Sequence, residues 1–283
     1  MLRAAGEASA GRAYASRSAA ARSRKSSRFL RLARALTVNR MAPKELWLVR
    51  HGESVANIAA TRAEVEGLDV IPIDTRDADV PLSPTGEEQA LALRTWMDGR
   101  RGSIDRFYAS PYLRARQTLT VALDSVEQAA PRILIDERLR DRELGVLDLL
   151  TRAGVARLQP AEAQRRRHLG KFYHRPPGGE SWADVALRLR SFLRDLDADP
   201  RAGSVLIVAH DAVVMVLLYL LLPLDEAGLL QFAASRTVLN ASVTHLTRSG
   251  DSWQLDAFAD VTHLHIDGAP VTVHPGSPDV QPT

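Results

Sequence analysis

The sequence predicts an α/β fold, a three-layer α/β/α sandwich in which helices cover both faces of a mainly parallel sheet. From residue 45 onward, short apolar runs alternate with longer stretches of helical periodicity, a pattern typical of β–α–β units. Two alternating runs near the end of the chain are joined by Ser-Gly-Asp, which favours a hairpin. The length of 283 residues and the 45% hydrophobic content allow a substantial core, in one large or two small domains.

Four apolar runs are predicted to be buried strands. They are residues 45–49 (ELWLV), 105–110 (DRFYAS), 132–136 (RILID) and 204–209 (SVLIVA). The late hairpin is predicted over residues 237–248 and 252–260. Residues 58–82 and 145–180 form connections long enough to serve as lids or binding loops.

Serine residues mark three predicted helix starts. Ser83 and Ser110 each precede a proline, and proline is favoured at the first helical position. Ser181 is followed three residues later by Asp184, which resembles a capping box. We therefore expect all three serines to cap the N-termini of helices.

The chain is predicted to have a folded body at residues 41–266 between a leader and a tail. The leader, residues 1–40, holds nine arginines and Lys25 against Glu7 alone, a net charge of +9. With few large apolar residues it cannot bury enough surface to fold alone, so we expect it to be disordered. The tail, residues 267–283, is rich in proline and turn-forming residues, and we expect disorder there as well.

The leader's composition has two explanations. It resembles an organellar transit peptide, and it also resembles translated upstream sequence with Met41 as the start. We favour the second explanation and expect a cytoplasmic protein. A genuine transit peptide would direct the protein to an organelle instead.

The composition also argues against several classes of function. The chain has no cysteine, which excludes disulfides and thiolate metal sites. The net charge of +3 comes from the leader, because the remaining residues hold 27 basic and 33 acidic side chains. The body therefore gives no indication of nucleic-acid binding. The most apolar segment, residues 205–224, contains His210 and Asp211, so we expect no membrane span.

Polar side chains follow three of the predicted strands. Arg50 and His51 come directly after the first strand, Ser110 ends the second with Arg114 four residues later, and His210 follows the strand at 204–209. Because ligands of open α/β sheets bind beyond the carboxyl ends of the strands, we expect these groups to meet at one edge.

These residue types favour phosphate chemistry. Arginine presents a planar fork of donors that matches phosphate oxygens, and two arginines with a protonated histidine would offset a phosphate dianion. A neutral imidazole can attack phosphorus and form a covalent intermediate. Asn57 could donate a further hydrogen bond to the transferring group. A leaving alkoxide needs a proton, and Asp141 or Glu143 could supply it, since bound phosphate would raise the pKa of a neighbouring carboxyl group.

The chain from about residue 45 to 265 resembles the histidine phosphatase superfamily, the phosphoglycerate mutase-like enzymes. Three of its motifs occur here in the family's order: LVRHGESVAN at 48–57, PLSPTGEEQA at 81–90 and SPYLRARQT at 110–118. The resemblance implies the phosphoglycerate mutase-like fold. It also implies that His51 is the phosphorylated nucleophile, and that Arg50, Arg114 and His210 bind the phosphoryl group with help from Asn57.

Two positions depart from the family pattern. The family's acid stands four residues before a glycine, which gives Asp141 by counting back from Gly145 and leaves Glu143 as the alternative. Aspartate replaces the usual glutamate there. Asp211 replaces the usual glycine after the second histidine, and we expect it to cap the following helix and point away from the phosphate.

We predict a phosphatase acting on small phosphorylated molecules, because the region after the acid motif lacks the basic insert of the related mutases and carries an FYHRPPGGES run typical of phosphatase members. A bisphosphoglycerate-dependent phosphoglycerate mutase is the alternative, and a non-catalytic phospho-ligand binding module is a second one. We expect no metal or organic cofactor, because the arginines would neutralise the charge that Mg²⁺ neutralises elsewhere.

Overall fold

The computed structural model describes residues 42–100, 102–123 and 131–274, so the predicted leader and the last nine residues lie outside it. Within the described residues the strands form a six-stranded sheet of order β3-β2-β4-β1-β5-β6. The strands are β1 (Glu45–Arg50), β2 (Arg106–Ala109), β3 (Ile133–Ile135), β4 (Ser204–Ala209), β5 (Val243–Ser249) and β6 (Ser252–Asp260). The first four in sheet order are parallel, and β5 and β6 are antiparallel to their neighbours.

The central strand β4 shows why the sheet needs a helical layer on each face. Every residue of β4 is buried, and successive side chains of a strand point to opposite faces. Val205 and Ile207 join the core that includes α7 (Trp182–Ala198) and α8 (Asp211–Leu221). Leu206 and Val208 join the core that includes α3 (Pro84–Asp98) and α4 (Leu113–Leu123).

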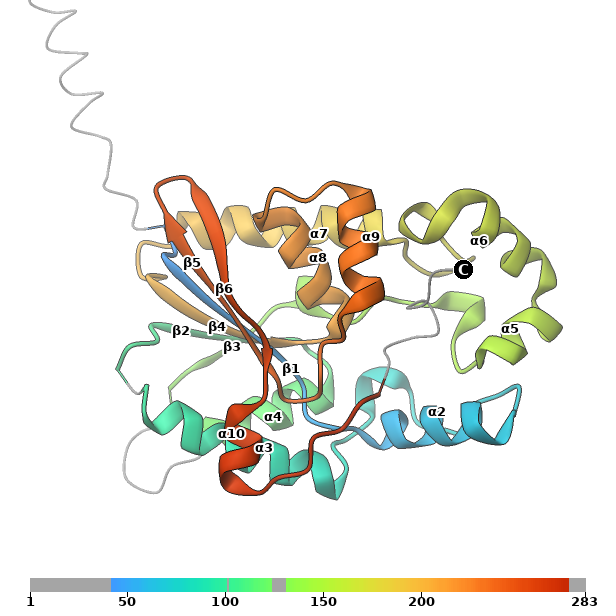
Figure 1. Cartoon of the computed structure of the whole chain (residues 1–283), viewed down its shortest axis with the longest axis horizontal. Helices are drawn as coiled ribbons and strands as arrows, with labels where there is room; N and C mark the ends of the chain where they lie inside the picture. Colours follow the sequence, from blue (N-terminus) through green and yellow to red (C-terminus); the bar gives the residue numbers. More distant parts are fainter. Residues whose placement is uncertain (1–41, 101, 124–130, 275–283) are drawn as a thin grey trace, which may run out of the picture. The chain divides into compact units, whose positions relative to one another are not determined.

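The two helical layers are visible in Figure 1, with α7 and α8 on one side of the sheet and α3 and α4 on the other. On the first side α9 (Glu226–Ser235) packs against α8, and on the second α10 (Thr262–Asp267) packs against α3. The predicted three-layer α/β/α architecture with a mainly parallel sheet is confirmed.

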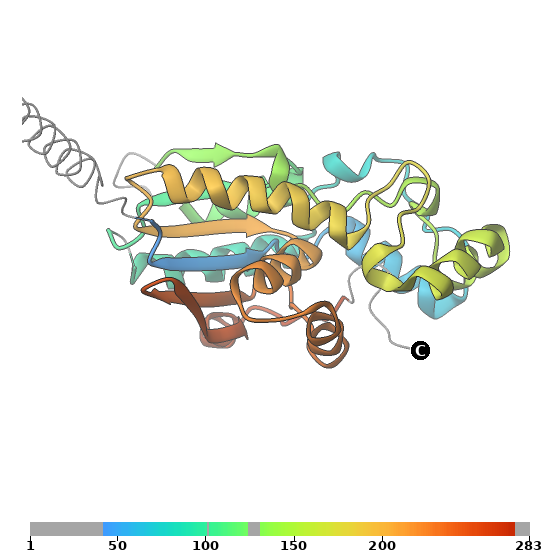
Figure 2. The same cartoon turned by 90° about the horizontal axis from the view of Figure 1, so that it is seen from above.

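Further helices lie beyond the carboxyl ends of the strands, where Figure 2 shows α2 (Val55–Glu66), α5 (Arg152–Leu158) and α6 (Pro160–Tyr173). Three short 3-10 helices complete the described elements: η1 (Asp77–Asp79), η2 (Glu137–Leu139) and η3 (Gly145–Leu147). The two connections predicted as long loops therefore contain helices, which place side chains around the carboxyl edge of the sheet.

Two predicted boundaries need correction. The helix predicted from Ser110-Pro111 begins at Leu113, and the first strand of the hairpin begins at Val243 rather than at residue 237. In the segment before β5 the backbone of Ala241 has a φ of 53°, which is incompatible with an extended strand. The hairpin itself is confirmed, and Gly250 in its turn has a φ of 62°.

The predicted tail also differs in part. Asp267 ends α10, Gly268 follows with a φ of 71°, and residues 268–274 run toward α2 (Figure 1). Residues 267–274 are therefore part of the folded body, whereas residues 275–283 lie outside the described chain. Among the described residues, no helix combines the length and the apolar character needed to cross a bilayer.

Candidate active site

A cavity of about 390 Å³ opens at the carboxyl edge of the sheet. Its lining includes most of the residues that the sequence brought forward: Arg50, His51, Asn57, Arg114, Asp141 and Glu143. His210 is fully buried and lies directly behind Asp141, with 3.3 Å between its Nδ1 and the Oδ2 of that carboxyl. The convergence predicted from the strand ends is therefore present in the structure.

His51 is held in one tautomer by its backbone. Its Nδ1 lies 2.7 Å from the carbonyl oxygen of Gly52, and because a carbonyl only accepts, Nδ1 carries the proton. The lone pair of a neutral ring is then on Nε2, which faces Nε of Arg114 at 3.2 Å. Burial and the charge of Arg114 lower the pKa of His51 well below its usual value. His51 is therefore a neutral imidazole whose Nε2 lone pair accepts a hydrogen bond from Nε of Arg114.

The backbone around His51 is fixed by close contacts. The N–H of Gly52 donates to Oγ1 of Thr118 at 3.0 Å, and Nδ2 of Asn240 donates to the carbonyl oxygen of His51 at 3.1 Å. A Cβ at position 52 would lie 2.6 Å from the carbonyl oxygen of Gly86, so only glycine fits between the loop and α3. These contacts hold the backbone that carries the imidazole in one position.

Arg50 is buried, and its guanidinium is anchored at one end. Its NH1 donates to the carbonyl oxygens of Val238 at 2.6 Å and of His274 at 3.0 Å. Its Nε is buried without a hydrogen-bond partner among the described residues. An unpartnered buried donor beside the cavity fits an anionic ligand.

Arg114 binds two carboxylates. Its NH1 lies 2.9 Å from Oδ1 of Asp77, and its NH2 lies 3.2 Å from Oδ2 of Asp141. Burial acts to lower the pKa of Arg114, but these two carboxylates outweigh it and raise the pKa. Arg114 is therefore charged, and its guanidinium is engaged by carboxylate oxygens of Asp77 and Asp141.

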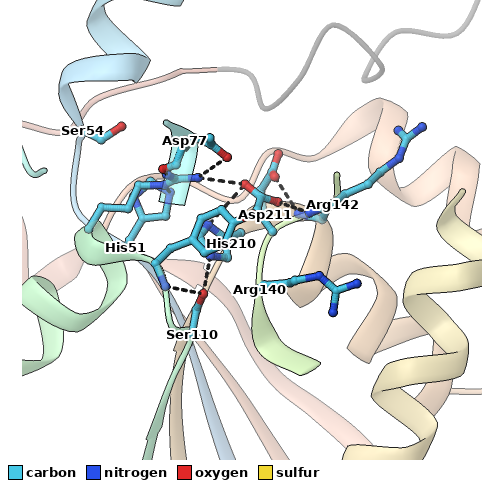
Figure 3. Close-up of polar contacts among 12 residues, drawn as sticks. His51, Ser54, Asp77, Ser110, Arg140, Arg142, His210 and Asp211 are labelled. Atoms are coloured by element: carbon cyan, nitrogen blue, oxygen red, sulfur yellow. Dashed lines mark hydrogen bonds and ion pairs between the residues drawn. The ribbon is translucent and has the colours of Figure 1, made fainter. Parts of the chain in front are cut away.

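His210 is oriented by Ser110. Figure 3 shows the two side chains together, with Nε2 of His210 2.8 Å from Oγ of Ser110. The other ring nitrogen, Nδ1, faces Asp141. The prediction that Ser110 caps a helix is wrong, because α4 starts later in the chain. The hydroxyl of Ser110 instead orients the ring of His210 by hydrogen bonding to its Nε2.

The two candidate acids lie in different surroundings. Asp141 contacts both Arg114 and His210, whereas Glu143 is half-exposed and accepts a hydrogen bond from the hydroxyl of Tyr112 at 2.8 Å. Burial acts to raise the pKa of Asp141, but His210 and Arg114 outweigh it and hold the pKa well below its usual value. A Cβ at Gly145 would lie 2.1 Å from the carbonyl oxygen of Pro177, so this glycine lets the acid-bearing loop pack closely.

Asn57 has a structural and a ligand-facing side. It forms a capping box with Ser54 at the start of α2, and its Oδ1 also accepts from Nδ2 of Asn240 at 3.3 Å. Because the amide oxygen is engaged, the NH₂ group is the part of Asn57 that can donate to a ligand.

Asp211 does not behave as predicted. It is the first residue of α8 rather than its N-cap, which is His210, and it lines the same cavity as His51. Its Oδ1 accepts from the adjacent N–H of Ala212. The expectation that Asp211 points away from the phosphate site is therefore wrong, and the cavity holds one more carboxylate than predicted.

Several groups of the site escaped sequence analysis. Asp77 contacts Arg114 from a segment with no periodic pattern, and Asn240 reaches His51 from the stretch predicted as strand. The sequence did place Ser110 at the ligand edge, because it ends a parallel strand, but its hydrogen bond to His210 was not predicted.

Two arginines, two histidines and the carboxylate of Asp141 lie together at the carboxyl edge of a parallel sheet, a set of groups suited to binding and transferring a phosphoryl group. The chain belongs to the histidine phosphatase superfamily, branch 1, whose sequence model matches residues 46–261.

The chain is also similar in sequence and structure to individual known proteins. The chain is 31% identical over 192 residues to the phosphoglycerate mutase-like protein AT74H of Arabidopsis thaliana, covering 63% of this chain and 66% of that protein. It is 30% identical over 230 residues to the probable phosphoglycerate mutase GpmB of Yersinia enterocolitica, covering 78% and 94%. A mycobacterial glucosyl-3-phosphoglycerate phosphatase, solved in complex with VO₃, superposes with a TM-score of 0.60 at 26% identity, covering 76% and 98%. The phosphoglycerate mutase-like fold is thereby confirmed.

Proposed function

We propose that the chain is a phosphomonoester hydrolase that acts on small phosphorylated metabolites through a phosphohistidine intermediate. The observation that carries this proposal is the state of His51, a buried neutral imidazole with its proton on Nδ1 and its Nε2 beside Arg114. A nucleophile in that state can attack phosphorus directly.

In the first step the lone pair on Nε2 of His51 forms a bond to phosphorus, and the bond from phosphorus to the ester oxygen breaks. Arg50, Arg114 and His210 hold the three non-bridging oxygens, with Asn57 as a further donor. The ester oxygen leaves as an alcohol by taking a proton from Asp141. The phosphate dianion displaces Asp141 from its ion pairs, which removes the groups that keep its pKa low and allows it to carry this proton.

In the second step a water molecule attacks phosphorus and the bond to Nε2 breaks. Asp141 accepts a proton from the water, so it returns to its starting form when inorganic phosphate leaves. Water is the acceptor in this scheme, whereas a mutase would pass the phosphoryl group to a second hydroxyl.

The charge of the outer cavity supports hydrolysis over mutase activity. Beyond the phosphate-binding groups, the lining carries the carboxyl groups of Glu64, Glu143 and Asp148 against the two arginines Arg142 and Arg152. A mutase must bind a second anionic group of its bisphosphate, and the excess of one carboxyl group over the arginines disfavours it. A monophosphate whose remainder is uncharged is better matched to this surface.

One assay separates the two activities. We expect release of inorganic phosphate from an aryl phosphate without any bisphosphate primer, and slow or no interconversion of 2- and 3-phosphoglycerate. Fast interconversion with negligible hydrolysis would contradict the proposal. A phosphohistidine intermediate is checked by quenching with labelled substrate, which should leave label on the protein that is stable to alkali and lost in acid.

A further inference from the structure

Residues 268–274, here called the C-terminal strap, cross from α10 to α2 and pass behind the phosphate-binding residues. In Figure 1 the strap is the dark red segment that leaves α10 and approaches α2. It is tied to α3 by Gln89, whose Nε2 donates to the carbonyl oxygen of Pro270 at 2.8 Å and to Oγ1 of Thr272 at 3.0 Å. The other end of the Gln89 amide accepts from the N–H of Glu53 at 2.8 Å. One buried side chain thus joins the strap to the loop that follows β1.

The imidazole of His274 fixes the end of the strap. Its Nε2 lies 2.6 Å from Oε2 of Glu53, and its Nδ1 lies 2.7 Å from Oγ1 of Thr61. The Glu53 carboxylate is only 6% exposed and also accepts from Oγ of Ser83 at 2.7 Å. Both ring nitrogens are therefore engaged, which sets the backbone of His274 in one place.

That backbone contacts a phosphate-binding residue. The carbonyl oxygen of His274 accepts from NH1 of Arg50 at 3.0 Å, and the carbonyl oxygen of Val238 accepts from the same nitrogen at 2.6 Å. The two protons of NH1 are thereby used, while Nε of Arg50 is buried without a hydrogen-bond partner in the described part of the chain. The guanidinium is held by one corner and presents the rest of its fork to the cavity.

We propose that the C-terminal strap positions Arg50 for phosphate binding, with His274 as the positioning residue. This inference rests on the proposed function, because it assumes that Arg50 binds the phosphoryl group. Without the carbonyl of His274, one NH1 proton loses its acceptor, and the nearby charges of Asp211 and Asp141 attract the guanidinium instead. The fork then turns from the position in which it meets phosphate oxygens.

The test compares His274→Ala and His274→Gln with wild type and with His265→Ala, a matched control on an exposed residue of α10. Competitive inhibition by inorganic phosphate reports on Arg50, and we expect its Ki to rise about tenfold in His274→Ala. Because Arg50 holds the same oxygens before and during the reaction, KM should rise while kcat changes less than about twofold. His274→Gln retains a donor for Glu53 and should recover most of the phosphate affinity.

A double-mutant cycle separates positioning from a general effect on stability. In an Arg50→Ala background, the effect of His274→Ala on the phosphate Ki should vanish. A lower Tm with an unchanged Ki in His274→Ala would show that the strap is only structural, and an equal effect in both backgrounds would also overturn the inference. Suppose that wild type and His265→Ala bind phosphate and hydrolyse an aryl phosphate. If His274→Ala then has the same phosphate Ki and the same rate, the strap inference fails and the proposed function stands. Absence of both properties in wild type would overturn the proposed function itself.

Discussion

The inner and outer halves of the cavity are built in different ways. The inner half is lined by Arg50, His51 and Arg114, with His210 buried behind Asp141. These four residues lie at strand ends or one helical turn beyond and are at most 4% exposed. The outer half comes from α2 and from the loops around η1 and η3, and its side chains are more exposed and alternate between apolar and charged. In the proposed function, the sheet edge supplies the chemistry and the connections supply selectivity among substrates.

The largest expected effect comes from the inner half. His51→Ala removes the attacking lone pair, so hydrolysis of an aryl phosphate should fall by at least about 10³-fold. Phosphate binding should persist, because Arg50 and Arg114 remain. Phosphate release and calorimetric titration with inorganic phosphate measure the two properties. Unchanged hydrolysis would exclude His51 as the nucleophile, whereas phosphate binding without hydrolysis in wild type would leave the site as a binding module.

Asp141 and Glu143 lie between the two halves, and we expect only Asp141 to act as the general acid. Asp141→Asn should slow hydrolysis of an alkyl phosphate by about 10²-fold or more, because a poor leaving group needs the proton. The loss should be smaller with p-nitrophenyl phosphate, whose leaving group is stable as an anion. Glu143→Gln is the matched control, with an expected change below about threefold. A larger loss in Glu143→Gln would move the acid role to that residue.

The pKa of His51 tests whether solvent reaches the inner half of the cavity. Burial and the charge of Arg114 lower its pKa, so the neutral, nucleophilic form should persist well below pH 6.5 and be lost only as the pH falls through the lowered value. An NMR titration of the His51 ring protons measures this directly. A midpoint at or above 6.5 would mean that solvent reaches the ring.

The smallest effect is expected in the outer half. Leu150 lies on the apolar wall of the cavity with Ile71, Leu144 and Leu149. Leu150→Ala should lower kcat/KM for naphthyl phosphate by about three- to tenfold, since less apolar surface is buried, and leave ethyl phosphate within about twofold. Leu187→Ala, on an exposed face of α7, is the control. An equal loss for both esters would place Leu150 in the support of the chemistry instead.

The sequence predicted the inner half of the cavity better than its surroundings. The strand ends carry a strong signal, because parallel strands share a carboxyl edge, and so the sequence placed Arg50, His51 and His210 together. Asp77 and His274 carry no such signal. The contact between His274 and Arg50 spans 224 positions and uses a backbone carbonyl, which any residue type provides. Asp211 was misplaced because the sequence does not show which side of the helix start faces the cavity.

The contacts of Arg114 have a consequence for turnover. Asp77 and Asp141 are counter-ions of Arg114, so in the proposed reaction a phosphate group exchanges with carboxylates that already bind the arginine. Breaking the ion pairs between Arg114 and these carboxylates offsets part of the favourable interaction between Arg114 and phosphate. The affinity for inorganic phosphate is limited for this reason. The same groups stand ready to reoccupy the arginine as inorganic phosphate departs. A strongly cationic pocket would retain its product, whereas in the proposed hydrolysis these counter-ions favour its release.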